Sequence, residues 1–445
     1  MDGFHDEGVR IVNNNGGKPP GIHAGLVTAK LSGLEQIMTL IVFEPVLTGH
    51  HETLLRQYLR LFCAMPIRVR LICAKQDLFR GEKWLEDALG EGRFSVAVLP
   101  ERRLPDHRLP MPIRLLWSSV IDFRYWLELR REILSTRALR PDLPVGVYFM
   151  FLGSKPFFPS AFWNWCVPVP WAALCAQAWR APRRIRETWI GQLWEWIGTA
   201  GPRCTGCRRV FFWCGEPEKF LKANVGPDKM RMVTDSTDVS LPEKVPAWLS
   251  VLERSCEGKK VVCLVGAVTP RKGVKTFLAA SRMLQDFPVC FVIAGKVDWN
   301  LFDEVTTKCL LTAAERGQAG LGNLFVLDQR VEVEADLNWI LNRSALCYLA
   351  YVGFDGSSNV LSKAAAFRVP VLVSEGTVMA QACRRYNLGW VVPGEDDEAV
   401  TKSVLAAVSE DMDTARDFTG FAALQSEAAL DAQLQEMVHL LQQPA

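Results

Sequence analysis

The sequence has almost no net charge, and this limits the partners that it can attract by charge alone. Its 51 Lys and Arg residues nearly balance 49 Asp and Glu residues, which leaves a net charge of +2 over 445 residues. Nothing in this balance indicates nucleic acid, which basic proteins bind through an excess of positive charge. The hydrophobic fraction of 49% and the charged fraction of 22% are typical of packed globular proteins. A chain of this length is expected to form two or three domains.

The N-terminus lacks the apolar core of a signal peptide, and the cysteines lack the spacing of a disulfide framework. Residues 1–33 are polar, and we expect a disordered lead-in. Thirteen cysteines are present, but members such as Cys263 and Cys290 lie inside apolar runs, which favours free buried thiols in a reducing cytoplasm. Cys204 and Cys207 form a close pair without a second one, so a zinc site is the less favoured alternative.

One long stretch contains no charged residue at all. It covers Pro156–Trp179, 24 positions, which is long enough to span a bilayer. Four prolines lie within it, and they would leave carbonyl groups without partners in lipid, so we exclude a transmembrane helix. Two interpretations remain open: a buried strand over 167–174 flanked by core aromatics, or a surface that contacts anionic headgroups. The surface would comprise Phe157, Phe158, Phe162, Trp163, Trp165 and Trp171, followed by Arg180, Arg183, Arg184 and Arg186.

Strand and helix patterns alternate on both sides of a polar linker at 233–245 and predict an α/β fold with parallel sheets. We therefore divide the chain into the lead-in over 1–33, an N-terminal domain over 34–240, a C-terminal domain over 241–430 and a helical tail over 431–445. Expected strands of the first half lie at 36–43, 68–73, 94–99, 145–152 and 210–213. Those of the second half lie at 261–265, 289–294, 324–327, 345–351, 371–373 and 390–392.

Two loops of the second half place glycine, lysine and serine at the ends of expected strands. In KKVVCLVGAVTPRKG, residues 259–273, a buried strand ends at Gly266, and Lys272 opens a helix. A glycine turn between a parallel strand and a helix leaves N–H groups facing outward, where a phosphate can bind with lysine as its counter-charge. The strand at 345–351 similarly leads to Ser358, a candidate N-cap. Both loops should face one crevice at the carboxyl edge of the sheet.

The second domain resembles the nucleotide-sugar-binding half of GT-B glycosyltransferases, in particular the large retaining group called family 4. Gly266–Gly273 resembles the family's glycine–lysine loop for the donor phosphates. Ala345–Pro370 resembles the segment that carries two glutamates eight positions apart. The resemblance implies two Rossmann-like domains whose parallel sheets face a central cleft, with the acceptor bound by the first domain and the nucleotide sugar by the second.

The sequence departs from the family pattern at four positions. Ala267 stands where the family usually has an arginine that binds the donor diphosphate, and Arg368 replaces a glycine. The two glutamates map to Asp355 and to Lys363, which cannot accept hydrogen bonds from the donor ribose. The sequence is more similar to a subgroup that has Gly-Ser-Ser-x-Val-Leu in place of the paired acids, here at 356–361, together with an N-terminal Gly-His loop.

The resemblance implies a set of donor-site residues. Lys272 would neutralise the charge that develops on the leaving diphosphate, and Asp355 would face the sugar or stabilise the cationic ring. The alternatives are a solvated lysine, serines that only cap a helix, and an aspartate that only forms a turn. The expected donor contacts are Gly266, Arg271, Lys272, Gly356, Ser357, Ser358, Asn359 and Lys363, and the catalytic candidates are Asp355, His50 and Lys272.

The acceptor side rests on one loop. Gly49 follows the first expected strand and could approach the cleft closely, because it has no side chain. His50 or His51 would orient the acceptor hydroxyl or the donor phosphates, and the alternative is a loop histidine without a function.

These observations predict a retaining glycosyltransferase of hexosyltransferase type. It would move a sugar from a nucleotide-sugar donor to a glycan, a lipid-linked or a small acceptor, without a metal ion and without a cofactor besides the donor substrate. A non-catalytic GT-B binding or scaffold protein is the alternative, because of Ala267, Lys363 and Arg368; an epimerase or hydrolase on the same fold is a third. We expect a cytoplasmic protein, with peripheral contact at the cytoplasmic membrane face left open.

Overall fold

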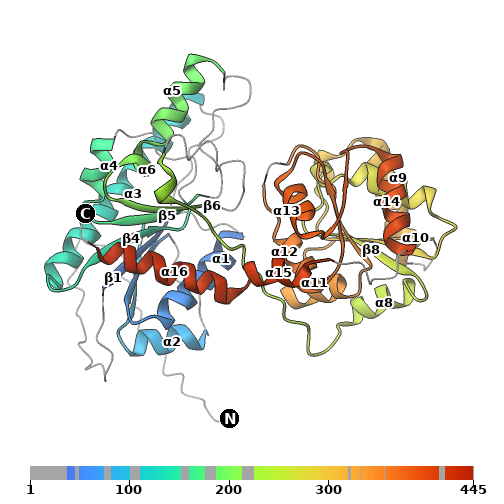
Figure 1. Ribbon diagram of the computed structural model, residues 1–445, viewed down its shortest axis with the longest axis horizontal. Coiled ribbons are helices and arrows are strands. Elements are labelled where there is room, and N and C mark those ends of the chain that lie inside the picture. Colours follow the sequence, from blue (N-terminus) through green and yellow to red (C-terminus); the bar gives the residue numbers. More distant parts are fainter. Residues whose placement is uncertain are drawn as a thin grey trace, which may run out of the picture.

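The computed structural model has two α/β domains that lie side by side (Figure 1). Each domain is built on one parallel sheet with helices on its faces, so the α/β class predicted from the sequence is confirmed. The structure describes residues 38–45, 50–74, 82–100, 111–151, 160–175, 187–212, 225–318, 322–331, 333–354, 356–409 and 416–443.

The sheet of the N-terminal domain has seven strands in the order β3-β2-β1-β4-β5-β6-β7, and neighbouring strands are parallel. All positions of β1, β4 and β5 are buried, as expected for central strands that are covered on both faces. The strands are β1 Thr39–Glu44, β2 Arg68–Cys73, β3 Phe94–Val98, β4 Val145–Phe149, β5 Trp171–Cys175, β6 Cys207–Phe212 and β7 Met230–Met232.

The helices of this domain cover the sheet with two apolar clusters. Tyr58 of α1 belongs to the cluster on one face, and Trp126 of α3 belongs to the cluster on the other. The helices are α1 His50–Ala64, α2 Lys83–Gly90, α3 Met111–Leu139, α4 Ser160–Cys166, α5 Trp189–Gly198 and α6 Ala200–Arg203, followed by the 3₁₀ turn η1 Pro227–Lys229.

The sheet of the C-terminal domain has six parallel strands in the order β10-β9-β8-β11-β12-β13. The chain order reverses between β8 and β11, because the strands before and after this point are added on opposite sides. Such a switch point opens a crevice at the carboxyl ends of the two strands. The strands are β8 Lys260–Val265, β9 Val289–Ala294, β10 Leu324–Leu327, β11 Leu346–Leu349, β12 Val371–Ser374 and β13 Gly389–Val392.

Several helices of the second half begin at a side-chain cap. The hydroxyl of Thr377 accepts a hydrogen bond from the amide of Ala380 at the start of α13, and Ser426 caps α16 in the same way. The helices are α8 Ala247–Ser255, α9 Val274–Met283, α10 Glu304–Gln318, α11 Glu334–Asn342, α12 Asn359–Ala366, α13 Val378–Tyr386, α14 Asp397–Ser409, α15 Phe418–Leu424 and α16 Glu427–Gln442. The 3₁₀ turns are η2 Pro270–Lys272 and η3 Trp299–Leu301.

The C-terminal helix returns to the N-terminal domain (Figure 1). Its apolar residues complete the core on one face of the first sheet, and Glu436 forms an ion pair of 2.6 Å with Arg209 of β6. The chain therefore crosses between the domains twice, through the linker and through the segment that joins α15 to α16. The two crossings touch where the hydroxyl of Thr234 donates to the carbonyl oxygen of Leu424 at 2.9 Å.

The uncharged stretch of the sequence is mainly core where it is described. Trp171 begins β5 and is fully buried, and Trp163 of α4 stacks on it with ring centroids 5.2 Å apart. The surface interpretation is therefore wrong for these two residues, while Trp165 is exposed. The strand begins at Trp171 instead of position 167, because α4 and a short connection occupy the preceding residues. The remaining members of the expected surface, apart from the half-buried Phe162, lie outside the described residues.

One cysteine pair differs from the expectation of free thiols. The structure joins Cys256 and Cys290 in a disulfide with Cα atoms 5.5 Å apart, because the end of α8 lies against β9. The expectation of a free thiol is therefore wrong for Cys290. Cys204 and Cys207 are buried and free.

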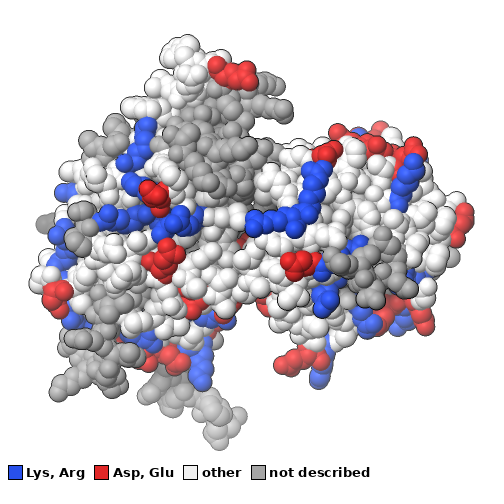
Figure 2. All heavy atoms as spheres, in the orientation of Figure 1, with Lys and Arg blue, Asp and Glu red and all other residues white. Residues whose placement is uncertain are grey.

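Acidic and basic side chains are mixed over the face shown in Figure 2, in agreement with the low net charge. Within the described ranges, every helix is too short or too polar to cross a bilayer.

Candidate functional site

The first loop of the candidate site connects β8 to α9. The strand ends at Val265, Gly266 follows with a φ of 86°, and the turn η2 leads to Gly273 with a φ of 70°. A Cβ atom on Gly273 would lie 2.4 Å from the carbonyl oxygen of Ala350, just after β11. Glycine suits this position for two reasons: it adopts the positive φ easily, and it has no side chain that would collide with this oxygen. The loop is therefore held tightly against the end of the strand across the switch point.

Lys272 extends along this loop and is 8% exposed. Its ammonium group donates to the carbonyl oxygen of Val265 and lies 5.4 Å from the ring centroid of Tyr351. Burial lowers the pKa of Lys272 from 10.5 to about 8. Within the described part of the chain, no carboxylate forms an ion pair with this group. A buried cation without an anionic partner is unfavourable by itself, and a bound anion would relieve it.

The second loop connects β11 to α12 and is tied to the first one. The amide of Val352 donates to the carbonyl oxygen of Arg271 at 2.7 Å, and the hydroxyl of Tyr348 donates to that of Gly273 at 3.0 Å. Ser358 occupies the N-cap position of α12, as the sequence predicted, but its hydroxyl does not cap the helix.

Arg271 is exposed, and its guanidinium lies 4.4 Å from the ring centroid of Phe354 in the second loop. This cation–π contact holds the positive charge at the mouth of the crevice. From the sequence alone, the side chain of Arg271 could face either the site or the solvent. The contact with Phe354 shows that it lies against the second loop.

The structure thus brings together most of the residues expected at the donor site. Two cations from the first loop, Lys272 and Arg271, lie beside the loop that leads to the N-terminus of α12. The free N–H groups and the dipole of a helix N-terminus favour an anion. The arrangement can therefore bind and neutralise a phosphate group.

Lys363 is placed differently from the other expected donor contacts. Its side chain is 1% exposed and is directed toward α11 and the linker. The ammonium group donates to the carbonyl oxygen of Asp238 and to Asn338, both at 2.7 Å, and forms an ion pair of 2.6 Å with Glu334. Its three protons therefore have protein acceptors. Burial lowers the pKa of Lys363, and Glu334 opposes this effect.

Comparison with known proteins bears on the same segment of the chain. Residues 259–410 match the family model of Glycosyl transferases group 1. The C-terminal domain is a group 1 glycosyl transferase domain. No curated protein matches the chain.

Solved structures extend the likeness of the group 1 domain to both halves of the chain. The N-terminal domain of trehalose-6-phosphate phosphatase from Candida albicans has 12% identity and a TM-score of 0.65, covering 93% of this chain and 98% of its own. Anabaena HepE in complex with UDP and glucose has 10% identity and a TM-score of 0.58, covering 90% and 99%. WaaG, a glycosyltransferase involved in lipopolysaccharide biosynthesis, has 13% identity and a TM-score of 0.55, covering 90% and 99%. At such low identity the likeness concerns the fold, and the predicted GT-B fold is confirmed.

The acceptor-side predictions fall mostly outside what the structure describes. Gly49 lies outside the described residues, and so does Asp355, the catalytic candidate of the donor side. His50 and His51 are the first residues of α1, but their side chains are not among the described ones. Their proposed roles therefore stay predictions.

Two carboxylates near the expected site were missed by the sequence reasoning. Glu44 ends β1 beside the switch point of the first sheet and is 2% exposed. A charged residue at the end of an apolar strand was the signal in the sequence. Asp235 lies in the linker and contacts Ser357 and Asn359, both at 3.4 Å. No local pattern could have indicated this contact, because it depends on the path of the linker.

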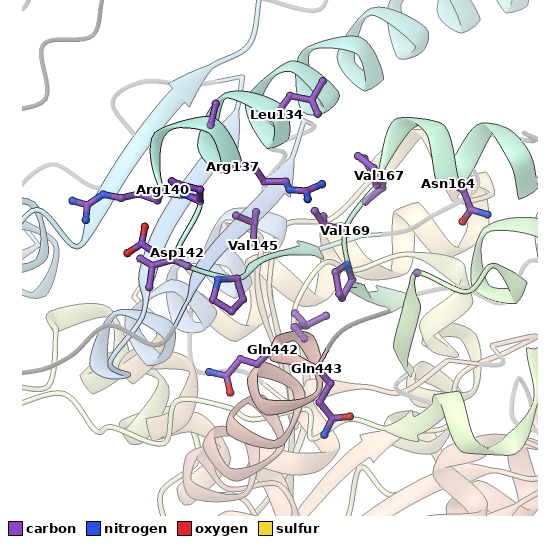
Figure 3. Close-up of a pocket in the computed structure, with 18 of the residues that line it drawn as sticks. Leu134, Arg137, Arg140, Asp142, Val145, Asn164, Val167, Val169, Gln442 and Gln443 are labelled. Carbon is purple, nitrogen blue, oxygen red and sulfur yellow. The ribbon is translucent and has the colours of Figure 1, made fainter.

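A cavity of about 980 Å³ lies on the other side of the N-terminal domain (Figure 3). It is lined by the end of α3 with Arg137, by residues before β4 and β5 such as Val145 and Val169, and by the end of α16 with Gln442. It therefore opens at the amino edge of the first sheet and is separate from the group 1 site. Among the described residues, no three His, Cys, Asp or Glu side chains lie close enough together to hold a metal ion.

Proposed function

We propose that this chain is a retaining glycosyltransferase that transfers a hexose from a nucleotide-sugar donor, without a metal ion. One observation supports the donor site most strongly: Lys272 is buried at the switch point of the group 1 domain and has no carboxylate partner among the described residues. A nucleoside diphosphate would supply the missing negative charge. The structure of HepE, one of the relatives in fold, holds UDP and glucose, which supports UDP as the first nucleotide to test.

The proposed chemistry is electrostatic. Cleavage of the bond between the anomeric carbon and the phosphate oxygen leaves negative charge on the diphosphate and positive charge on the sugar ring. Lys272 and the amides that precede α12, at Gly356, Ser357 and Ser358, would stabilise the leaving group. Asp355 would stabilise the ring cation or bind a sugar hydroxyl. The acceptor hydroxyl would attack from the N-terminal domain, where we assign its orientation to His50.

We further propose a lipid-linked acceptor and peripheral membrane contact through α5. This helix projects from the N-terminal domain (Figure 1), and four large apolar side chains on it are exposed. They are Trp189, Ile190, Leu193 and Trp196. Arg203 lies 4.7 Å from the ring centroid of Trp196, so a cation accompanies the aromatic surface. Tryptophan with arginine suits the boundary between anionic headgroups and acyl chains.

The donor proposal is tested by thermal unfolding with a panel of nucleoside diphosphates and nucleotide sugars. A ligand at a hundred times its dissociation constant should stabilise the protein by about 2.7 kcal/mol. We expect a shift for one nucleotide, UDP first, that is lost in Lys272→Ala. Lys275→Ala is the matched control, because Lys275 lies nearby on α9, which follows the loop of Lys272, but is 69% exposed and paired with Asp303. Slow hydrolysis of the matching sugar nucleotide would then separate an enzyme from a binding protein.

Two results would contradict the proposal. If no nucleotide shifts the melting temperature, the donor site is not functional and a non-catalytic GT-B protein becomes the better description. If the Lys272 and Lys275 variants lose the shift equally, the buried lysine is not the anion-binding group. Retention is tested separately, by the anomeric configuration of the product.

A further inference from the structure

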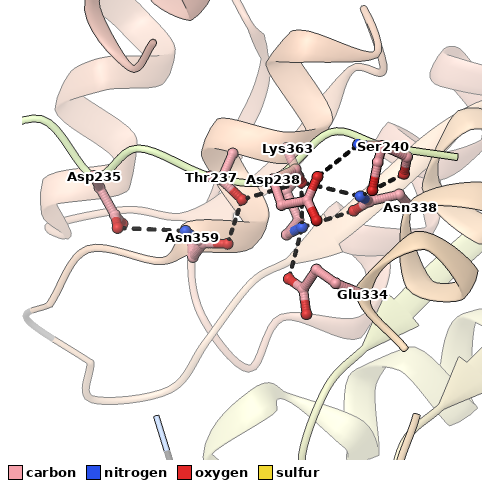
Figure 4. Close-up of polar contacts among 8 residues, drawn as sticks. All are labelled: Asp235, Thr237, Asp238, Ser240, Glu334, Asn338, Asn359 and Lys363. Carbon is pink, nitrogen blue, oxygen red and sulfur yellow. Dashed lines mark hydrogen bonds and ion pairs between the residues drawn. The ribbon is translucent and has the colours of Figure 1, made fainter. Parts of the chain in front are cut away.

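The linker between the two domains is fixed to the C-terminal domain by a polar network (Figure 4). Residues 233–246 form no helix or strand, so other groups have to satisfy their backbone. The network joins linker residues 235–240 to α11 and α12. Its members are Asp235, Thr237, Asp238, Ser240, Glu334, Asn338, Asn359 and Lys363.

Lys363 is the charged centre of this network. A buried ammonium group is tolerated only when its protons are bound, and here a carbonyl, an amide and a carboxylate oxygen receive them. An acidic residue at this position would place its oxygens against the carbonyl oxygen of Asp238, which also accepts. Position 363 therefore needs a hydrogen-bond donor such as lysine, because the linker directs the carbonyl oxygen of Asp238 toward it.

Asn338 extends the contact along the linker. It is 0% exposed, and its amide nitrogen donates to the carbonyl oxygens of Asp238 at 3.0 Å and Ser240 at 2.9 Å. Its own oxygen accepts from Lys363. All hydrogen-bonding atoms of this side chain are used, so the lysine and the asparagine fix the linker backbone as one unit.

The same linker segment contacts the end of the second loop, which joins β11 to α12, and the first residue of α12. Thr237 donates to the side chain of Asn359 at 2.8 Å, and Asp235 accepts from Asn359 and Ser357 at 3.4 Å. From the other domain, Gln57 of α1 donates to Ser236 at 2.9 Å. One short segment thus contacts both the second loop and the N-terminal domain.

We propose that Lys363 is a positioning residue for donor binding that acts through the linker. By fixing Asp238, it sets the position of Asp235 and Thr237, and these two residues orient Ser357 and Asn359 at the N-terminus of α12. This inference rests on the proposed function for its effect on the donor, while the fixing of the linker can be measured without any ligand. The proposal gives a role at the donor site to Asp235 and Thr237, which lie in the linker and outside the motif at 356–361.

The test compares Lys363→Met with Lys402→Met in the full chain. Methionine keeps the length and the apolar stem of lysine. Lys402→Met is the control for the loss of a lysine charge away from the linker, because Lys402 forms an exposed ion pair with Glu398. Hydrogen exchange of the nucleotide-free proteins is measured first, and the affinity for UDP second. The amides of Asp235 and Ser240 donate to the side chains of Gln425 and Asp238, so their exchange reports the order of the linker. We expect it to become about tenfold faster in the first variant only, because the bond of Lys363 to the carbonyl oxygen of Asp238 is lost. We expect the dissociation constant for UDP to rise about tenfold.

A second variant keeps the proposal testable if Lys363→Met folds poorly. Thr237→Val preserves shape and removes only the hydroxyl that contacts Asn359. We expect it to weaken UDP binding severalfold, about 3 to 10 times, while exchange at 238–240 stays as in the wild type. Unchanged linker exchange in Lys363→Met would overturn the proposal. So would faster exchange with unchanged UDP affinity in both variants, since Lys363 would then be structural only. A wild type that binds no UDP would instead count against UDP as the donor nucleotide, and the exchange data would still decide whether Lys363 fixes the linker.

Discussion

Replacing Lys272 by methionine should stabilise the ligand-free protein and at the same time remove its response to the donor nucleotide. The lysine is 8% exposed, and burial lowers its pKa from 10.5 to about 8. A fall of that size corresponds to about 3 kcal/mol of destabilisation while the group is charged. Methionine fills the same volume without a charge.

The net gain is smaller because favourable contacts are also lost. The hydrogen bond to the carbonyl oxygen of Val265 contributes about 1 kcal/mol, and the contact with the ring of Tyr351 contributes about 0.5 kcal/mol. We therefore expect Lys272→Met to gain about 1–2 kcal/mol at pH 7, which raises the melting temperature by about 2–8 °C for a domain of this size.

The pH dependence gives this prediction its sign. Between pH 8 and 10.5 the unfolded chain still holds the proton that Lys272 has lost in the folded state, so the wild type gains stability from this group as the pH rises. The stability that Lys272→Met gains over the wild type should be fully present below pH 8 and should disappear as the pH rises toward 10.5. Affinity for UDP should fall above about pH 8 in the wild type, because the neutral amine attracts no phosphate. The assay is thermal unfolding at matched pH values, with and without UDP. A variant that melts below the wild type at pH 7 would refute the reasoning.

Three further predictions concern the loop, the surface and the C-terminal helix. Gly273→Ala should lower stability by about 2–4 kcal/mol and weaken UDP binding, because the added Cβ would lie 2.4 Å from a carbonyl oxygen; urea unfolding and calorimetry measure both. Joint replacement of Trp189 and Trp196 by Ala should abolish co-sedimentation with anionic liposomes at low salt and leave the melting temperature within about 1 °C; a wild type that stays in the supernatant contradicts the membrane proposal. Glu436→Ala should cost about 1–3 kcal/mol in urea unfolding, since Arg209 is left buried and unpaired, whereas Arg209→Met should cost less; the reverse order would argue against this account.

The α/β order of the chain could be predicted because it depends on local patterns. The strands of the second sheet are apolar runs that end in glycine or a polar turn, and the expected positions of β9 and β10 match the structure. The linker was expected at 233–245 because this segment is polar and contains a proline. The juxtaposition of Lys272 with the loop before α12 also followed, since parallel strands share one carboxyl edge.

The remaining features depend on contacts that no local pattern encodes. The aromatic residues around Trp163 suit either a core or a membrane surface, and only the packing of α4 on β5 decides between them. Lys363 could be mapped to a motif position, but the direction of its side chain depends on where the linker runs. The sequence likewise could not indicate that α16 packs on the first sheet, because an amphipathic helix fits many apolar faces.

The double crossing of the chain has a mechanical consequence. Two domains that are joined by a single polypeptide segment can rotate about many axes. Two adjacent connecting segments restrict the relative rotation of the domains to a single hinge axis. A protease cut within residues 241–246 would leave α16 seated in the core of the first domain, so the two fragments should remain associated as a non-covalent complex. Opening and closing in this protein is therefore expected to be a rotation about the line through Thr234 and Leu424, where the two connections meet.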